Sequence, residues 1–319
     1  MSSTLSTAMS QNLSSSQLKT LCSAAIQAAQ EAGQWIEKFD RRDLQAMFKD
    51  AGSSEASQIV TKVDIASEEI IRKRLQEISE PLNIGFVGEE SSTSSSTANT
   101  LSENTSSENK WGNANERFEK PYFWCVDPLD GTLPFAEGRS GYAVSIALVE
   151  QSGKPVIGVV YDPARQTLLH AIKGQGSYRD LTPFSQIKDT SNSLMVYADA
   201  SFKTHKKCES SVSALETCAK TLCLDGVTFI YGSGAVKNAC HVLGSSQACY
   251  LKLPKVEDGG GSIWDYAATA CIAHEAGAWA SNIYGHPLAL NRSDSTFMNH
   301  EGVIFASNEQ IAGYLIDAL

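Results

Sequence analysis

The chain has 319 residues, a length that predicts two domains of moderate size. Its hydrophobic fraction of 42% is sufficient for a packed core and excludes a disordered chain as the overall description. The 26 Lys and Arg residues against 36 Asp and Glu residues give a formal net charge of −10, which disfavours nucleic acid polymers as partners. A small anionic ligand remains compatible with this charge if a bound cation or a helix N-terminus assists.

Residues 1–16 are rich in Ser and Thr and contain no Lys or Arg, so we expect a disordered leader rather than a targeting signal. No apolar run approaches the roughly 20 residues that span a bilayer, so no membrane segment is expected. The 8 cysteines include no CxxC pair, which indicates reduced, buried thiols in a cytoplasmic protein. The 6 histidines form no HExxH motif, which disfavours a zinc hydrolase.

The N-terminal part begins with two expected helices. Apolar residues recur at helical spacing between Leu18 and Phe39, and a second helix is expected to follow Asp64. Residues 91–115 are dominated by Ser, Thr and Asn, and we interpret them as a polar surface insertion because apolar segments flank them. Beyond it, β-branched and aromatic runs predict an antiparallel meander with strands at Phe123–Val126, Ala143–Val149, Val156–Tyr161 and Leu168–Ile172.

Beyond Pro183 the pattern alternates between strands and helices. Strands are expected at Leu194–Ala198, Thr228–Tyr231, Ala248–Leu253, Ala278–Asn282 and Val303–Ala306. Helices are expected at Glu209–Cys223, Ala235–Leu243, Ile263–Ala276 and Glu309–Ala318. The sequence therefore predicts an α+β domain over residues 17–182 and an α/β domain over residues 183–319.

The motif DPLDGT, which follows an apolar predicted strand, carries the clearest chemistry. Its proline fixes φ in a turn, so that Asp127 and Asp130 can point to the same side together with the carbonyl of Leu129. Gly131 permits close approach of a ligand, and Thr132 adds a hydroxyl group. Oxygen ligands of this kind suit a hard cation, Mg²⁺ above all. The alternative is an ordinary Asx turn, which the combination of a strand and the full motif disfavours.

Three further segments place acids at the ends of predicted elements. An apolar run ends in the pair Glu89-Glu90, a short run ends at Asp64, and Asp265 lies at the start of a helix after three glycines. Each acid alone has an ordinary explanation, because Asp64 and Asp265 could be helix N-terminal acids and the glutamates could begin a solvated loop. Their occurrence together with DPLDGT favours a shared metal site.

These motifs together resemble the four signatures of the inositol monophosphatase superfamily, whose members are Mg²⁺-dependent and typically lithium-sensitive phosphatases. The resemblance covers the chain from Leu18 to its end and rests on Val60-Thr-x-x-Asp64, Gly88-Glu89-Glu90, Asp127-Pro-Leu-Asp130-Gly-Thr132 and Trp264-Asp265-x-Ala-Ala. It implies a layered αβαβα sandwich of the inositol monophosphatase/fructose-bisphosphatase type, with residues 17–182 as the metal-binding domain and 183–319 completing the active site. It also implies two or three Mg²⁺ ions held by Glu89, Asp127, the Leu129 carbonyl, Asp130 and Asp265.

The resemblance further implies hydrolysis of a phosphate monoester by a water molecule activated between metal ions about 4 Å apart. Asp64 and Thr132 would orient and deprotonate this water, with Glu89 close by. The backbone N–H groups of Gly131 and Thr132 would bind the phosphate if a helix begins there.

Within the superfamily the sequence is most similar to the 3′(2′),5′-bisphosphate nucleotidases, which remove the 3′-phosphate of adenosine 3′,5′-bisphosphate. The sulfated form of this nucleotide is a further candidate substrate. Ser233 and Lys237 resemble a helix start that contacts the nucleotide, with Lys237 pairing with the second phosphate, and His205 resembles a histidine near the adenosine. The ordinary alternatives are a solvated helix lysine for Lys237 and a surface histidine for His205.

Two other functions stay open. An inositol monophosphatase or another sugar-phosphate phosphatase is the alternative, because Leu133-Pro134-Phe135 stands where nucleotidases more often have Lys-Glu. A catalytically silent protein that binds Mg²⁺ or a nucleotide is disfavoured because every motif position is filled. The expected partner is a small anionic phosphate ester, and a homodimer is compatible with a superfamily that includes monomers and dimers.

Overall fold

The computed structural model describes residues 12–39, 53–92, 111–185, 191–259 and 261–319. Most of the expected leader over 1–16 lies outside the described residues, and so does most of the polar insertion over 91–115. The first helix, α1 (Ser15–Lys38), begins inside the expected leader because Ser14 and Gln17 form a capping box at its N-terminus.

The second long helix, α3 (Ser53–Ser79), begins well before Asp64, which corrects the expectation that this acid precedes a helix. The physical reason is that no proline or glycine interrupts residues 53–79, so the helix continues through the acid. The described face of α3 buries Val63, Ile71 and Leu75 against α1 and the first sheet. Asp64 therefore lies in the middle of helix α3 and not at its N-terminus.

The first sheet has seven strands in the order β1-β2-β3-β4-β5-β6-β7. β1 pairs with β2 in parallel, and the other neighbours pair antiparallel, so the predicted meander is confirmed. Two short strands at its far edge were not expected, because three residues carry too little pattern to read. The strands are β1 (Ile84–Gly88), β2 (Tyr122–Asp130), β3 (Ala143–Glu150), β4 (Pro155–Asp162), β5 (Thr167–Ile172), β6 (Ser177–Arg179) and β7 (Thr182–Phe184).

The end of the predicted polar insertion docks on β1. Trp111 is buried, its ring lies 5.1 Å from that of Phe86, and its indole N–H donates a hydrogen bond of 2.8 Å to the Ile84 carbonyl. The short helix α5 (Glu116–Glu119) then leads into β2. Residues 111–115 are thus part of the folded domain, although composition alone grouped them with the insertion.

The second sheet has five strands in the order β11-β12-β10-β8-β9. β8, β9 and β10 run parallel, while β12 pairs antiparallel with both β10 and β11. The strands are β8 (Ser193–Ala198), β9 (Gly226–Tyr231), β10 (Ala248–Lys252), β11 (Trp279–Ser281) and β12 (Val303–Ala306), and the helices between and after them are α7 (Cys208–Thr221), α8 (Ala235–Leu243), α9 (Ile263–Ala276) and α10 (Glu309–Ala318). Three shorter helical segments are η1 (Glu80–Leu82), α6 (Thr132–Ala136) and η2 (Ala200–Thr204).

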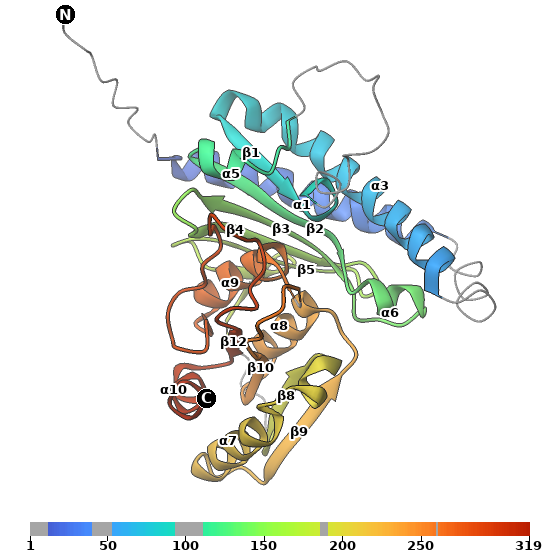
Figure 1. The fold of residues 1–319 in the computed structure, drawn as a ribbon. Coiled ribbons are helices and arrows are strands. Elements are labelled where there is room, and N and C mark those ends of the chain that lie inside the picture. Colours follow the sequence, from blue (N-terminus) through green and yellow to red (C-terminus); the bar gives the residue numbers. More distant parts are fainter. Residues whose placement is uncertain (1–11, 40–52, 93–110, 186–190, 260) are drawn as a thin grey trace, which may run out of the picture.

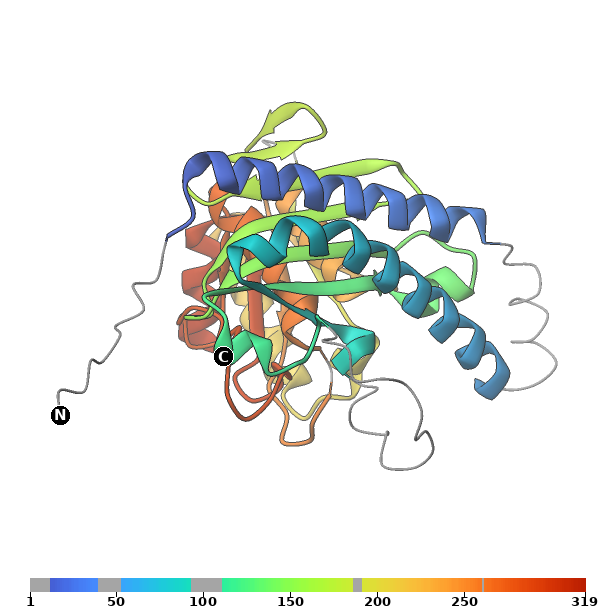
Figure 2. The same ribbon diagram turned by 90° about the horizontal axis from the view of Figure 1, so that it is seen from above.

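The elements stack in five layers, which confirms the expected αβαβα sandwich. Helices α1 and α3 cover one face of the first sheet, α8 and α9 lie between the two sheets, and α7 and α10 cover the far face of the second sheet (Figures 1 and 2). Helix α9 is buried on nearly all sides because its sequence is rich in alanine and carries almost no polar stripe. The predicted domain division at 182/183 falls within β7, and the division itself stays a prediction.

The eight cysteines are free thiols, as expected, and six of them are buried. Cys208 is partly exposed, and Cys223, beyond the C-terminal end of α7, is exposed, so the expectation of buried thiols does not extend to it. Among the described residues, no helix is both long and apolar enough to cross a bilayer.

Candidate active site

The C-terminal end of β2 presents two aspartates on one side of the strand. Asp127 pairs with Ser145 and Asp130 with Ala143 on β3, so β2 contains an extra residue between them and forms a bulge. The Leu129 N–H donates a hydrogen bond of 3.0 Å to Asp127 Oδ1, which closes an Asx turn. An Asx turn and a metal site are therefore compatible interpretations of the motif, because the turn orients the two aspartates.

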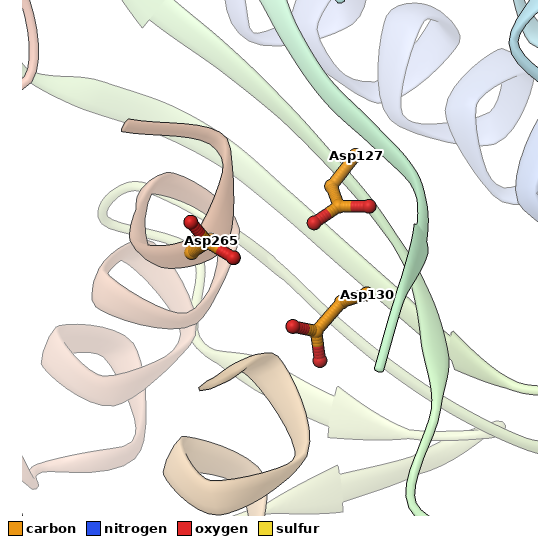
Figure 3. A group of neighbouring side chains, drawn as sticks. All are labelled: Asp127, Asp130 and Asp265. Carbon is orange, nitrogen blue, oxygen red and sulfur yellow. The ribbon is translucent and has the colours of Figure 1, made fainter. Parts of the chain in front are cut away.

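Asp265 completes a group of three carboxylates. One oxygen atom of each of Asp127, Asp130 and Asp265 lies within 4.8 Å of the others, and the three side chains point toward a common space (Figure 3). Asp265 lies in the first turn of α9, where it accepts a hydrogen bond from the Ser262 N–H. The group thus joins β2 of the first sheet to the helix that fills the space between the sheets.

Glu89 and Asp64 extend this acidic group from the α3 side. The parallel pairing of Gly88 with Val126 places Glu89 beside Asp127, and the two side chains share a hydrogen bond. Asp64 is only 7% exposed, and its Oδ1 atom has no hydrogen-bond partner among the described residues. Acids from all four predicted segments therefore meet in one place.

The electrostatics of these acids are unfavourable without a counter-charge. Burial, followed by repulsion from neighbouring carboxylates, raises the pKa of Asp64 and that of Glu89 to about 8. Burial and the same repulsion raise the pKa values of Asp127 and Asp130 well above the ordinary range. Burial also raises the pKa of Asp265, to about 6, although the Ser262 N–H and Lys252 lower it. Buried like charges and an orphaned carboxylate oxygen fit a site for divalent cations.

The start of α8 holds Asp130 in place. The N–H groups of Ala235 and Val236 donate hydrogen bonds of 2.9 and 3.0 Å to the two carboxylate oxygens of Asp130. Gly234 precedes them at the N-cap, and a Cβ atom there would lie 2.2 Å from Asp130 Oδ2. Ser233 comes just before this glycine and is partly buried.

Glu68 supports the site although it was not singled out in the sequence. It lies one helical turn after Asp64 and accepts hydrogen bonds of 2.8 and 3.0 Å from the N–H groups of Glu90 and Ser91. A Cβ atom on Gly88 would lie 2.2 Å from its carboxylate, which explains the glycine before the glutamate pair. The available signal was the spacing of four residues from Asp64, which places both acids on one helix face.

The turn after Asp130 agrees in part with expectation. Gly131 has φ of +84°, and α6 begins at Thr132, as the proposed phosphate contact requires. The Thr132 hydroxyl donates a hydrogen bond of 3.3 Å to the Leu129 carbonyl. The expected role of Thr132 and Asp64 in orienting and deprotonating a water stays a prediction.

Lys237 requires a correction. It was expected either to pair with a substrate phosphate or to be solvated, but it is 7% exposed, and its ammonium group lies 2.5 Å from the carboxylate of Asp162 at the end of β4. The helix periodicity is the reason, because it turns this position toward the first sheet while the start of α8 faces Asp130. Lys237 thus forms a buried ion pair inside the fold.

A cavity of about 400 Å³ adjoins the acidic group, and His205 lies in its wall. Both ring nitrogens of His205 contact backbone, Nε2 at 2.9 Å from the Pro254 carbonyl and Nδ1 at 3.1 Å from the Lys207 N–H. Asp199 and Lys252 line both this cavity and a second one of about 380 Å³, which also contains Glu89, Asp130 and Asp265. The two cavities therefore meet at Asp199 and Lys252, and neither was among the predicted site residues.

Comparisons with known proteins identify relatives of this chain. The chain is 28% identical over 269 residues to inositol monophosphatase 1 of Sus scrofa, covering 83% of this chain and 84% of that protein. It is 31% identical over 229 residues to 3′(2′),5′-bisphosphate nucleotidase 1 of Candida albicans, covering 63% and 60%. The match to inositol-1-monophosphatase of Bacillus subtilis, at 28% identity, spans 56% of this chain and 64% of that protein.

The fold is shared with solved structures. Inositol monophosphatase II of Staphylococcus aureus superimposes with a TM-score of 0.66 at 22% identity, covering 94% of this chain and 95% of that one. The profile described as the inositol monophosphatase family matches residues 17–319, which is almost the whole chain. The protein therefore belongs to the inositol monophosphatase family.

Proposed function

We propose that this protein is a metal-dependent phosphomonoesterase. The observation that carries the proposal is the group of Asp127, Asp130 and Asp265, whose carboxylate oxygens lie within 4.8 Å of one another beside Glu89 and Asp64. Membership of a family of phosphatases supports it.

The donor set suits two or three Mg²⁺ ions. The proposed ligands are all oxygen atoms, as a hard cation requires, from Glu89, Asp127, the Leu129 carbonyl, Asp130 and Asp265. When bound, such ions supply Lewis acidity toward phosphoryl oxygens and increase the acidity of water. The raised pKa values of the ligands and the unpartnered oxygen of Asp64 support this assignment.

The residues of the chain would then move the proton and hold the phosphate. The Asp64 carboxylate, whose Oδ1 atom has no hydrogen-bond partner among the described residues, would accept a proton from the attacking water. The phosphorus–oxygen bond to the alcohol breaks as water adds, and the leaving oxygen takes a proton from solvent. The first N–H groups of a helix have no partner within it, so Gly131 and Thr132 at the start of α6 can donate to the phosphate. The Thr132 side chain, with Glu89 close by, would orient the water.

For the substrate we propose adenosine 3′,5′-bisphosphate, with loss of the 3′-phosphate, and its sulfated form as a second ester. The adjoining cavity of about 400 Å³ contains three lysines and two carboxylates, so it offers positive charge to a second anionic group. His205 lines this cavity, and its ring would stack on the adenine of the substrate. The nucleotidase relative, at 31% identity, supports this choice. Since Lys237 is buried with Asp162, the second phosphate would contact lysines of the cavity instead.

An inositol phosphate or another sugar phosphate is the second candidate. It is favoured by the longer matches to inositol monophosphatases, of which the Sus scrofa enzyme covers 83% of this chain. Phosphate release from adenosine 3′,5′-bisphosphate and from inositol 1-phosphate, measured side by side with Mg²⁺, separates the two. A clear preference for the inositol ester would overturn the nucleotide assignment and keep the phosphatase.

The phosphatase assignment itself is tested with Asp130→Asn. This change keeps the size of the side chain and one of the two oxygen acceptors that face the N–H groups of Ala235 and Val236, and it removes one ligand charge. We therefore expect an intact fold and loss of nearly all Mg²⁺-dependent turnover. Circular dichroism and thermal unfolding report on the fold. Activity close to the wild type in this variant would contradict the site. No turnover of any phosphate ester by the wild type, with Mg²⁺ bound, would favour a silent binding protein.

Three further expectations from the sequence stay proposals. We propose inhibition by lithium, which competition assays at fixed Mg²⁺ can measure. A cytoplasmic location rests on the free thiols, and fractionation tests it. A homodimer is tested by light scattering.

A further inference from the structure

Asp199 and Lys252 form an ion pair where the two cavities meet. Their side chains are 19% and 15% exposed, and the Lys252 ammonium group donates to the Asp199 carboxylate. The pairing follows from the parallel register of β8 and β10, in which Tyr197 lies opposite Tyr250. Asp199 and Lys252 lie two residues further along each strand direction, so they face each other at the carboxyl ends of neighbouring strands.

The Asp199 carboxylate is held by more than the lysine. The Tyr250 hydroxyl lies 3.3 Å from each of its oxygens, and Asn238 Nδ2 lies 3.2 Å from Oδ1. Asp199 occupies the N-cap position of η2, yet its side chain makes no capping hydrogen bond there. Its contacts are thus made to Lys252 and to two buried side chains rather than to the backbone N–H groups at the start of the helix that it precedes.

The pair is electrostatically connected to the acidic group. Lys252 lowers the pKa of Asp265 and Asp199 raises it, so both charges act on that carboxylate. Lys252 is also one of the three lysines that line the cavity proposed for the second anionic group. An ammonium group has three N–H donors, so it can bind Asp199 and a substrate oxygen at the same time, but its charge is then shared.

We propose that Asp199 is a positioning residue that sets substrate specificity through Lys252, an inference that rests on the proposed phosphatase function. Asp199 holds the Lys252 ammonium group at the place where the two cavities meet, and it offsets the positive charge of this lysine. A second phosphate in the cavity meets this lysine together with a carboxylate that repels it, whereas an uncharged hydroxyl group at the same place meets no such repulsion. Asp199 therefore lowers the ratio of kcat/KM for a bisphosphate to kcat/KM for a monophosphate.

The test compares the ratio of kcat/KM for adenosine 3′,5′-bisphosphate to that for adenosine 3′-monophosphate, with Mg²⁺, in the wild type and in variants. Asp199→Asn keeps the shape of the side chain and removes its charge. We expect the ratio to rise about tenfold, mainly through a lower KM for the bisphosphate, as for an ordinary partly exposed charge pair. Lys252→Met should lower the ratio, and adding Asp199→Asn to Lys252→Met should raise the ratio by less than Asp199→Asn does alone.

Controls separate the possible outcomes. Asp225→Asn removes the same charge at an exposed position before β9, so it should leave the ratio unchanged. Asp199→Ser gives the same direction of change if Asp199→Asn does not fold. A merely structural Asp199 would lower both kcat/KM values together and leave the ratio constant, which would overturn the inference while the phosphatase function stands. Absence of turnover of both adenosine esters by the wild type, together with turnover of inositol 1-phosphate, would overturn the nucleotide assignment and the inference with it, whereas the phosphatase function would stand.

Discussion

The buried ion pair of Lys237 and Asp162 permits a test of the structure against the expectation from sequence. The two side chains are 9% and 4% exposed, with 2.5 Å between the ammonium nitrogen and the carboxylate. Burial raises the pKa of Asp162, but the charge of Lys237 and its hydrogen bond outweigh burial, and the resulting pKa is lowered. The carboxylate is thus ionised in the folded protein and depends on its partner.

We expect Lys237→Met to destabilise the protein by about 3 kcal/mol, the low end of the range for a buried pair that loses one partner. The low end applies because Arg165 still donates to Asp162 from its backbone N–H at 3.0 Å and its side chain at 3.3 Å. For a chain of this length, with about 2 cal/mol/K of unfolding entropy per residue, this loss lowers Tm by about 4 to 5 °C.

The measurement is urea or thermal unfolding of the wild type, of Lys237→Met, and of a double variant that adds Asp162→Leu. The double variant should recover part of the lost stability, because neither charge then remains buried. The KM for phosphate esters should stay close to that of the wild type in Lys237→Met. An unchanged Tm combined with a raised KM for the bisphosphate alone would refute this reasoning and restore Lys237 to the substrate pocket.

Three other predictions concern the acidic group. The folded protein holds extra protons on Asp64 and Glu89, whose pKa values are raised to about 8, so the stability of the metal-free form should fall as pH rises from about 4 to about 8. Since Mg²⁺ displaces these protons, the rise in Tm on adding Mg²⁺ should be larger at pH 8 than at pH 6. An equal rise in Tm at the two pH values would contradict the raised pKa values of Asp64 and Glu89. Glu68→Ala should lower kcat/KM by about 10- to 100-fold by releasing the turn that carries Glu89, and Glu68→Gln should retain more activity. Gly234→Ala should weaken Mg²⁺ binding in calorimetry by about tenfold because a Cβ would displace Asp130, whereas Gly313→Ala, which has open space, should not.

The regular elements and the acidic motifs were predictable because local pattern determines them. The predicted bounds of α8, α9 and α10 agree with the structure, since glycine, serine or asparagine stands at the N-cap of each helix and a glycine follows α8 and α9. The DPLDGT motif likewise carries its geometry within six residues, as the bulge and the Asx turn show.

The residues that were misplaced or missed depend on information that no short segment contains. One step along α8 rotates a side chain by about 100°, so a motif match could not decide whether Lys237 faces the site or the sheet. The partner of Lys237, Asp162, lies 75 residues away. Asp199 and Lys252 meet only through the register of two parallel strands, and register is a property of the sheet.

The position of Asp265 depends on how closely α9 approaches the first sheet. A Cβ atom on Gly158 of β4 would lie 2.3 Å from the Ala268 carbonyl, so the backbones of helix and strand touch at this point. The spacing between Asp265 and the two aspartates of β2 thus depends on a backbone contact between α9 and β4 that involves none of the three acids. A side chain at this position would therefore change the distance between Asp265 and the two aspartates of β2 without altering a single acidic residue.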